Sequence, residues 1–223
     1  MILEIENKVH EPRLGEGVYL TSDVAEILQL PYPKVRRWII ELWDAKFSEK
    51  EKYSFGDSNN RAVNFYTLIE FFTFYQLRQQ GVSSQKVQNA HRIISKELKT
   101  KYPFATNIRT DGKEIWYEYL DELINANGKQ QMDIKGILEP FLHKIEFGKN
   151  NLAELFFPVD KSKNVVVDPK RQFGQPIITG RNLRIETIKK MYEGGESKKN
   201  ICLLYDLKPS AVDDALRYYK RAS

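Results

Sequence analysis

The chain has 223 residues, of which 41% are hydrophobic and 29% charged, and its formal net charge is +5 at pH 7. This length leaves room for one or two domains with real hydrophobic cores, and the single cysteine, Cys202, excludes an intramolecular disulfide. Residues 1–8 lack the basic and apolar pattern of a secretory signal and no apolar run could span a membrane, so we expect a cytoplasmic protein with no membrane partner.

Two short helices are predicted between residues 19 and 40. Thr21 or Ser22 can cap the first helix by accepting a free backbone N–H. Apolar residues then recur at the three-and-four spacing of a helix: Val24, Ala25, Ile27 and Leu28. The motif Leu30-Pro31-Tyr32-Pro33 interrupts this pattern, because proline disfavours helical geometry in the residue before it but suits a first helical turn. The second helix is therefore expected to begin near Pro33.

The second helix is expected to present cations on its open side. Val35 and Ile39 are four residues apart and should face the first helix. The side chains that remain on the open side or the flank suit base edges and phosphates: Tyr32, Lys34, Arg36 and Arg37. The arrangement predicts a helix-turn-helix that binds DNA, and the alternative is an ordinary solvated helix face.

A β-hairpin is predicted after the second helix. The turn-forming residues 56–60 lie between Tyr53 and Phe55 on one side and the strand-like residues 62–65 on the other. This hairpin has the composition of a wing. We expect Asn60 and Arg61, at its edge, to contact DNA.

Two longer helices follow the hairpin. The first is rich in aromatic residues, runs from Thr67 to Arg78 and is closed by Gly81. Ser83 or Ser84 caps the second, which runs to about Leu98. Its buried stripe is expected to consist of Val87, Ala90, Ile94 and Leu98.

Residues 19–98 contain four motifs in a characteristic order: Leu20-Thr21, Val24-Ala25, Val35-Arg36-Arg37-Trp38 and Leu77-Arg78-Gln79-Gln80-Gly81-Val82-Ser83. In this order they resemble the winged helix-turn-helix of the MerR superfamily. The resemblance implies that residues 1–100 form a DNA-binding domain. The long dimerising coiled coil that is usual in that family is missing, because Tyr102-Pro103-Phe104 ends the last helix.

Residues 101–158 are predicted to form a connecting segment that contains β-hairpins. Asp111-Gly112 and Gly148-Lys149-Asn150-Asn151 are typical of hairpin turns, and Asn127-Gly128 marks another turn. The aromatic residues of this segment include Trp116, Tyr117, Tyr119, Phe141 and Phe147. Core packing or a dimer interface is the expected role for them, and stacking on bases is the alternative.

A compact unit is predicted for residues 159–223, after a linker at residues 159–164. Two short strands are expected in residues 165–169 and 174–180. Three helices follow, one from Ile185 to Tyr192, one capped by Ser197 and one from Ser210 with Asp213 as its capping-box partner. The apolar positions of the last two helices are Ile201, Leu204, Tyr205, Val212, Ala215, Leu216 and Tyr219.

The motifs of this unit are Asp168-Pro169, Gly174-Gln175-Pro176-Ile177-Ile178, Gly180, Gly194-Gly195-Glu196-Ser197 and residues 211–219. They resemble the small trihelical domain of VapB-type antitoxins, with Arg181 where a threonine is common. Combined with the MerR-like head, the resemblance implies the antitoxin of a type II toxin-antitoxin pair. It also implies that the toxin is a PIN-like ribonuclease.

Protein contact is the expected role of this C-terminal unit. Asp213 and Asp214 lie in the first turn of what would be a recognition helix, where carboxylates repel the DNA backbone. Residues 159–223 hold 14 Lys and Arg against 8 Asp and Glu, which suits an acidic partner surface. A PIN-like nuclease holds its metal with clustered carboxylates. Arg181 or Arg184 could therefore take the place of the cation and bind the toxin.

No catalytic residue, metal site or cofactor is expected, and we expect the protein not to be an enzyme. His10, His91 and His143 lie far apart in the sequence and lack the spacing of metal ligands. Cys202 lies on an apolar helix face and is expected to be a small core residue.

The sequence thus predicts a mainly α protein with three parts: an N-terminal winged helix-turn-helix (1–100), a small β-hairpin middle layer (101–158) and a C-terminal three-helix, helix-turn-helix-like domain (159–223). Its expected partners are double-stranded operator DNA and a PIN-like ribonuclease toxin, with assembly as a homodimer or as a hetero-oligomer with the toxin. In this hypothesis the protein autorepresses its operon and neutralises the toxin by direct binding. The alternative is a stand-alone MerR-like transcriptional regulator without a toxin partner.

Overall fold

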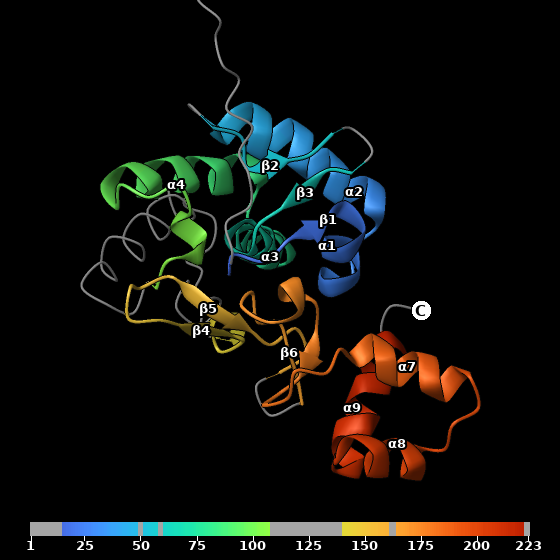
Figure 1. Cartoon of the computed structure of the whole chain (residues 1–223). Helices are drawn as coiled ribbons and strands as arrows, with labels where there is room; N and C mark the ends of the chain where they lie inside the picture. Colours follow the sequence, from blue (N-terminus) through green and yellow to red (C-terminus); the bar gives the residue numbers. More distant parts are fainter. Residues whose placement is uncertain (1–14, 49–50, 58–59, 108–139, 161–163, 221–223) are drawn as a thin grey trace, which may run out of the picture.

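The computed structural model describes residues 15–48, 51–57, 60–107, 140–160 and 164–220 (Figure 1). These residues are mainly helical and carry three small antiparallel sheets, as expected for the predicted mainly α class. None of the described helices has the length and apolar composition that a membrane crossing requires. The turns predicted at Asp111-Gly112 and Asn127-Gly128 lie outside the described residues.

The first two helices are α1 (Thr21–Leu28) and α2 (Tyr32–Arg37). Gln29 ends α1 with a left-handed φ of 55°, and proline occupies the first turn of α2, as predicted. α2 continues directly into a π-helical segment, η1 (Trp38–Phe47), which the sequence did not predict. α2 and η1 therefore form one continuous helical segment from Tyr32 to Phe47.

The predicted cap of α1 is wrong. The cap residue is Leu20, whose backbone N–H donates to Oδ2 of Asp23 at 2.9 Å. Thr21 Oγ1 donates instead to the carbonyl oxygen of Arg61 at 3.1 Å. The reason is tertiary, because Tyr19–Leu20 forms a strand, β1, and this strand turns Thr21 toward the neighbouring hairpin.

The first sheet has the strand order β1, β3 (Ala62–Val63), β2 (Ser54–Phe55). β2 and β3 pair antiparallel, which confirms the hairpin predicted here. β1 pairs with the other edge of β3, with Tyr19 opposite Val63. Figure 1 shows how this pairing places the start of α1 beside the hairpin.

Two longer helices, α3 (Phe65–Gln79) and α4 (Ser84–Glu97), complete the N-terminal part. α3 is buried along most of its length, and its Phe71 and Phe74 rings lie 4.4 Å and 5.2 Å from the Trp43 ring, between centroids. These edge-on aromatic contacts fasten η1 to the core. The stripe predicted for α4 is confirmed at three fully buried positions: Val87, Ala90 and Ile94.

The middle part packs onto the same core. After α4 comes a short 3-10 helix, η2 (Pro103–Ala105). β4 (Ile145–Phe147) and β5 (Ala153–Phe156) pair antiparallel and confirm the hairpin predicted around residues 148–151. The ring of Phe156 lies 4.7 Å from that of Phe72 in α3, so the hairpin rests directly on the central helix.

The C-terminal part consists of paired strands and three helices: β6 (Val165–Val166), η3 (Gln172–Gly174), β7 (Ile177–Ile178), α7 (Ile185–Glu193), α8 (Lys198–Tyr205) and α9 (Pro209–Lys220). The three predicted helices are confirmed, and Ser197 caps α8 by accepting the backbone N–H of Asn200 at 3.1 Å. The predicted capping box of α9 is wrong. This helix already contains Ser210, and Asp213 binds Lys198 of α8.

Residues 165–178 take part in two hydrophobic cores. Val165 packs in the core with α7, α8 and α9, whereas Val167 packs in the core with α1, α3 and β5. The backbone N–H of Val18 donates to the carbonyl oxygen of Phe173 at 3.0 Å, and Gln175 Nε2 donates to Asp23 Oδ2 at 3.0 Å. The two parts of the protein therefore share this segment.

Candidate nucleic-acid interface

α2 has one fully buried face and one exposed face. Val35 of α2 and Ile39, one turn further on in η1, are completely buried in the core that α1 also joins, as the spacing predicted. On the outside, Tyr32 is 46% exposed, and Arg36 and Arg37 are exposed as well. The buried face fixes the helix, so these three side chains are presented on a rigid support.

Lys34 lies on the flank of α2 and is only partly exposed. Its Nζ is 5.3 Å from the ring centroid of Trp38 and 4.9 Å from that of Tyr75. Such cation–π contacts orient the ammonium without neutralising it. Lys34 is therefore held beside the exposed row.

The cations of α2 form no ion pairs among the described residues. Within the part of the chain that the structure describes, no carboxylate lies within 4.0 Å of the side-chain nitrogens of Lys34, Arg36 or Arg37. Their guanidinium and ammonium groups can therefore donate to phosphate oxygens or to base edges. Tyr32, the first residue of α2, adds an aromatic side chain to the exposed face of this helix.

The two residues predicted at the hairpin edge differ in their surroundings. Asn60 is exposed, and its backbone N–H donates to Asp57 Oδ1 at 2.8 Å. Arg61 is folded inward: its Nη1 lies 2.9 Å from both Asp44 Oδ2 and Ser54 Oγ, and its side chain is 22% exposed. The structure thus places Arg61 as a brace between the hairpin and η1.

Asp44 is a residue that sequence reasoning missed. Besides Arg61, its Oδ1 accepts the backbone N–H groups of Tyr53 and Ser54, both at 3.0 Å. One carboxylate therefore ties η1 to the base of the β2–β3 hairpin. The sequence showed Asp44 only as one of two acidic residues, with Glu41, in a largely apolar helix, and nothing local indicates its distant partners.

The two arginines predicted to bind a toxin have carboxylate partners in the chain itself. Arg181 Nη2 lies 2.8 Å from Asp206 Oδ2, and Arg184 Nη2 lies 2.6 Å from Glu186 Oε2. Both guanidinium groups are partly exposed, so these are surface ion pairs that a partner can compete for. The two arginines therefore have different partners and do not form one cluster.

α8 presents an apolar surface that the sequence did not predict. Of its apolar residues only Ile201 is buried, whereas Leu203 is 74% exposed and Leu204 is 64% exposed. The expected burial of Leu204 is therefore wrong. α8 packs against α7 and α9 through Ile201, with Cys202 and Tyr205 beside it, and no described residue covers Leu203 and Leu204.

The other side chains that could have a chemical role make contacts within the chain itself. His91 is buried, with Nε2 2.8 Å from Glu70 Oε2, and Asp214 accepts from the Asn164 side chain at 2.9 Å. Cys202 is partly buried and packs against the C-terminal core, as predicted. Among the described residues, no three His, Cys, Asp or Glu side chains are grouped so that they could hold a metal ion.

Comparison with known proteins gives one match to a family model and two similar chains from Mycobacterium tuberculosis. The family, described as "Protein of unknown function (DUF433)", matches residues 165–219, which include β6 to α9. A protein named "Putative antitoxin VapB45" is 24% identical over 167 residues, which cover 68% of this chain and 69% of that protein. "Uncharacterized protein Rv2308" is 36% identical over 77 residues, which cover 34% and 32% of the two chains.

A solved structure shares the fold over most of this chain. It is titled "X-ray crystal structure of Rv2018 from Mycobacterium tuberculosis", and its TM-score is 0.72 at 21% sequence identity. The match covers 92% of this chain and 99% of that one. The arrangement of the N-terminal, middle and C-terminal parts therefore occurs in a second protein of related architecture.

Proposed function

We propose that this protein is a DNA-binding antitoxin that represses its own operon and neutralises a PIN-like ribonuclease toxin by direct binding. In this proposal it acts in the cytoplasm, needs no cofactor and catalyses no reaction. The similarity over 68% of the chain to a protein named "Putative antitoxin VapB45" supports the toxin-antitoxin role. The observation that carries DNA binding is the row of exposed cations on α2, opposite a completely buried face.

In the proposed complex α2 is the recognition helix of a MerR-like winged helix-turn-helix and enters the major groove. Arg36 and Arg37 reach base edges or phosphates, with Tyr32 beside them. Asn60, at the tip of the hairpin, approaches the neighbouring backbone, while Arg61 keeps the hairpin in place. Because one small module makes few base contacts, useful affinity requires a dimer on a repeated or palindromic site.

For the toxin we propose the exposed surface of α8. Leu203 and Leu204 form an apolar patch on the exterior, and such patches mark interaction sites. The exposed Lys199 and Lys208 precede and follow them in the chain, which suits an apolar partner surface with an acidic rim. Arg181 and Arg184 are the rival contacts, and a toxin would have to displace their present carboxylate partners.

We predict that the double substitution Leu203→Ser and Leu204→Ser weakens toxin binding roughly 100-fold or more. Burying a leucine at an interface contributes about 1.5 to 3 kcal/mol, and both contributions are lost. The melting temperature of the free protein should not change, because both side chains are already exposed. Calorimetry with the purified toxin measures the affinity, and recovery of its ribonuclease activity gives an independent readout.

The matched comparison uses Arg181→Ala and Arg184→Ala in the same assay. If the arginines are the buried contacts, each truncation costs about 2 to 5 kcal/mol of affinity and the leucine variant binds normally. That result would move the toxin surface from α8 to the turn after β7.

The toxin-antitoxin role as a whole is tested by co-expression with the product of the neighbouring reading frame, followed by size-exclusion chromatography. Co-elution of the two chains with loss of ribonuclease activity is the expected result. A chain that elutes alone and still binds the DNA upstream of its own coding sequence would instead be a regulator without a toxin.

A further inference from the structure

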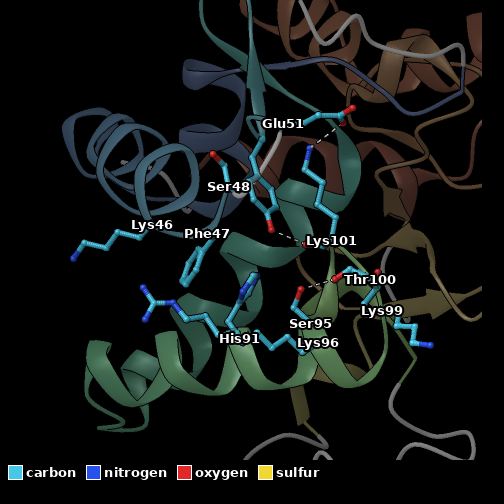
Figure 2. A pocket seen from close by; sticks show the side chains of 12 residues that line it. Lys46, Phe47, Ser48, Glu51, His91, Ser95, Lys96, Lys99, Thr100 and Lys101 are labelled. Atoms are coloured by element: carbon cyan, nitrogen blue, oxygen red, sulfur yellow. Dashed lines mark hydrogen bonds and ion pairs between the residues drawn. The ribbon is translucent and has the colours of Figure 1, made fainter. Parts of the chain in front are cut away.

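A cavity of about 530 Å³ lies between the end of η1, the start of the β2–β3 hairpin and α4 (Figure 2). Its size falls in the range of small-molecule sites in proteins, about 300 to 1,000 Å³. It is formed by elements other than the exposed face of α2, so it is separate from the proposed DNA-binding surface.

The lining of this cavity is strongly positive. Lys46 comes from η1, Arg92 and Lys96 come from α4, and Lys99 and Lys101 come from the segment after α4. Figure 2 shows Phe47 and His91 near the middle of the view, with Lys46 and Lys99 extending outward on opposite sides and Lys101 directed toward Glu51. Among the described residues of the lining, Glu51 is the single carboxylate, and it lies 3.9 Å from Lys101 Nζ. Within the described ranges, the other four cations have no carboxylate within 4.0 Å.

The cations of the lining repel one another, and a bound anion would relieve this repulsion. Arg92 and Lys96 are four residues apart on α4, where like charges repel each other. Lys99 has a φ of 48°, in the left-handed position after a helix where glycine is usual. The negative end of the α4 dipole favours Lys96 and Lys99, but it does not explain Arg92 or Lys46. Within the described residues, the chain therefore maintains a positive cluster in which Lys101 alone is paired with a carboxylate.

The floor of the cavity is rigid. The Phe47 and His91 rings stack at 4.1 Å between centroids, with an angle of 23°. Glu70 holds His91 from behind at 2.8 Å. At one side, Lys101 Nζ lies 4.9 Å from the Tyr53 ring, and burial lowers the pKa of this lysine. A bound molecule would thus meet a rigid aromatic floor with Lys101 held at its edge.

We propose that this cavity binds the polyphosphate group of a nucleotide-sized ligand. Several cations against one carboxylate match an anion of two or more charges, and ammonium and guanidinium groups are the usual partners of phosphate oxygens. The volume exceeds the needs of a single phosphate, which leaves space for an organic part beside the aromatic floor. The inference does not depend on the proposed antitoxin role.

The test is isothermal titration calorimetry, in which the full chain is titrated separately with ATP, inorganic tripolyphosphate and adenosine. ATP and tripolyphosphate are expected to bind with one site per chain, and adenosine is expected not to bind. Arg92→Gln with Lys96→Gln should lower the affinity at least roughly tenfold, because two charge-assisted contacts are lost. The melting temperature should stay the same or rise, since a like-charge pair is removed.

The control variant is Lys149→Gln with Lys220→Gln, which removes two positive charges from exposed positions outside the lining of the cavity. It should keep full affinity. Equal losses in the two double variants would mean diffuse attraction and overturn the proposal, as would the absence of saturable binding by both polyphosphates or equal binding of adenosine. If neither polyphosphate binds and Arg92→Gln with Lys96→Gln weakens duplex DNA binding instead, these cations extend the DNA surface.

Discussion

Replacing Arg36 and Arg37 together by alanine is expected to weaken binding to the operator roughly 100-fold. An arginine that reads a base contributes about 1 to 3 kcal/mol, and two such contacts multiply. Both side chains are exposed on α2, and no carboxylate of the described chain is within 4.0 Å of them, so the fold should be unaffected. Fluorescence anisotropy at one fixed salt concentration measures the effect on the DNA upstream of the coding sequence.

The matched control is Arg171→Ala with Arg217→Ala. These exposed arginines bind Asp168 and Asp214 of the chain itself, and the control removes the same net charge. It should change operator affinity little. Comparing specific with random duplex DNA then separates base reading from phosphate contact, because loss of a phosphate contact weakens all sequences alike. Unchanged binding by the Arg36 and Arg37 variant would remove α2 as the DNA-binding element.

Gly174→Ala is expected to destabilise the protein far more than Gly180→Ala. Both glycines have left-handed backbones, with φ of 87° and 76°, so each substitution introduces strain of about 1 to 2 kcal/mol. Only at Gly174 would the new Cβ also meet a neighbour, 2.5 Å from Cζ of the buried Tyr19. The space around Gly180 is open. Overpacking of this kind costs about 1 to 3 kcal/mol more.

Differential scanning calorimetry measures the two variants, and the difference in melting temperature between them should be on the order of 5 to 10 °C. Because Gly180→Ala carries the same backbone strain, the difference isolates the contact between residues 165–178 and the N-terminal core. Equal melting temperatures would show that this contact contributes nothing, and the two parts of the chain would then be independent. Limited proteolysis near residue 160 offers a second readout of the same contact.

Local patterns in the sequence were sufficient for most elements of the fold. The α1–α2 pair, the stripe of α4, the hairpins β2–β3 and β4–β5 and the order of α7, α8 and α9 were all predicted. Each depends on interactions within a few residues: apolar periodicity, capping by Ser83 or Ser197, proline at a helix start and turn-forming glycines. The exposure of Arg36 and Arg37 followed from the same periodicity, because Val35 and Ile39 had to face inward.

Tertiary structure decided what the candidate side chains can reach. Arg61 looked like a free cation at a hairpin edge, but Asp44, 17 residues earlier, holds it against η1. The positive cavity unites side chains from residues 46 to 101, which share no local motif.

The same holds for the ends of the elements and for the C-terminal surface. β1 displaces the expected cap of α1, and local patterns did not indicate this because the partner strand of β1 lies about 40 residues away. Likewise, Tyr19 packs against Gly174, which lies far along the chain. Leu204 carried the spacing of a core residue, yet no element covers that side of α8 in the described structure. Periodicity states which residues share a face of a helix. Only the packing of distant segments determines which face is covered and which cations remain available to a ligand.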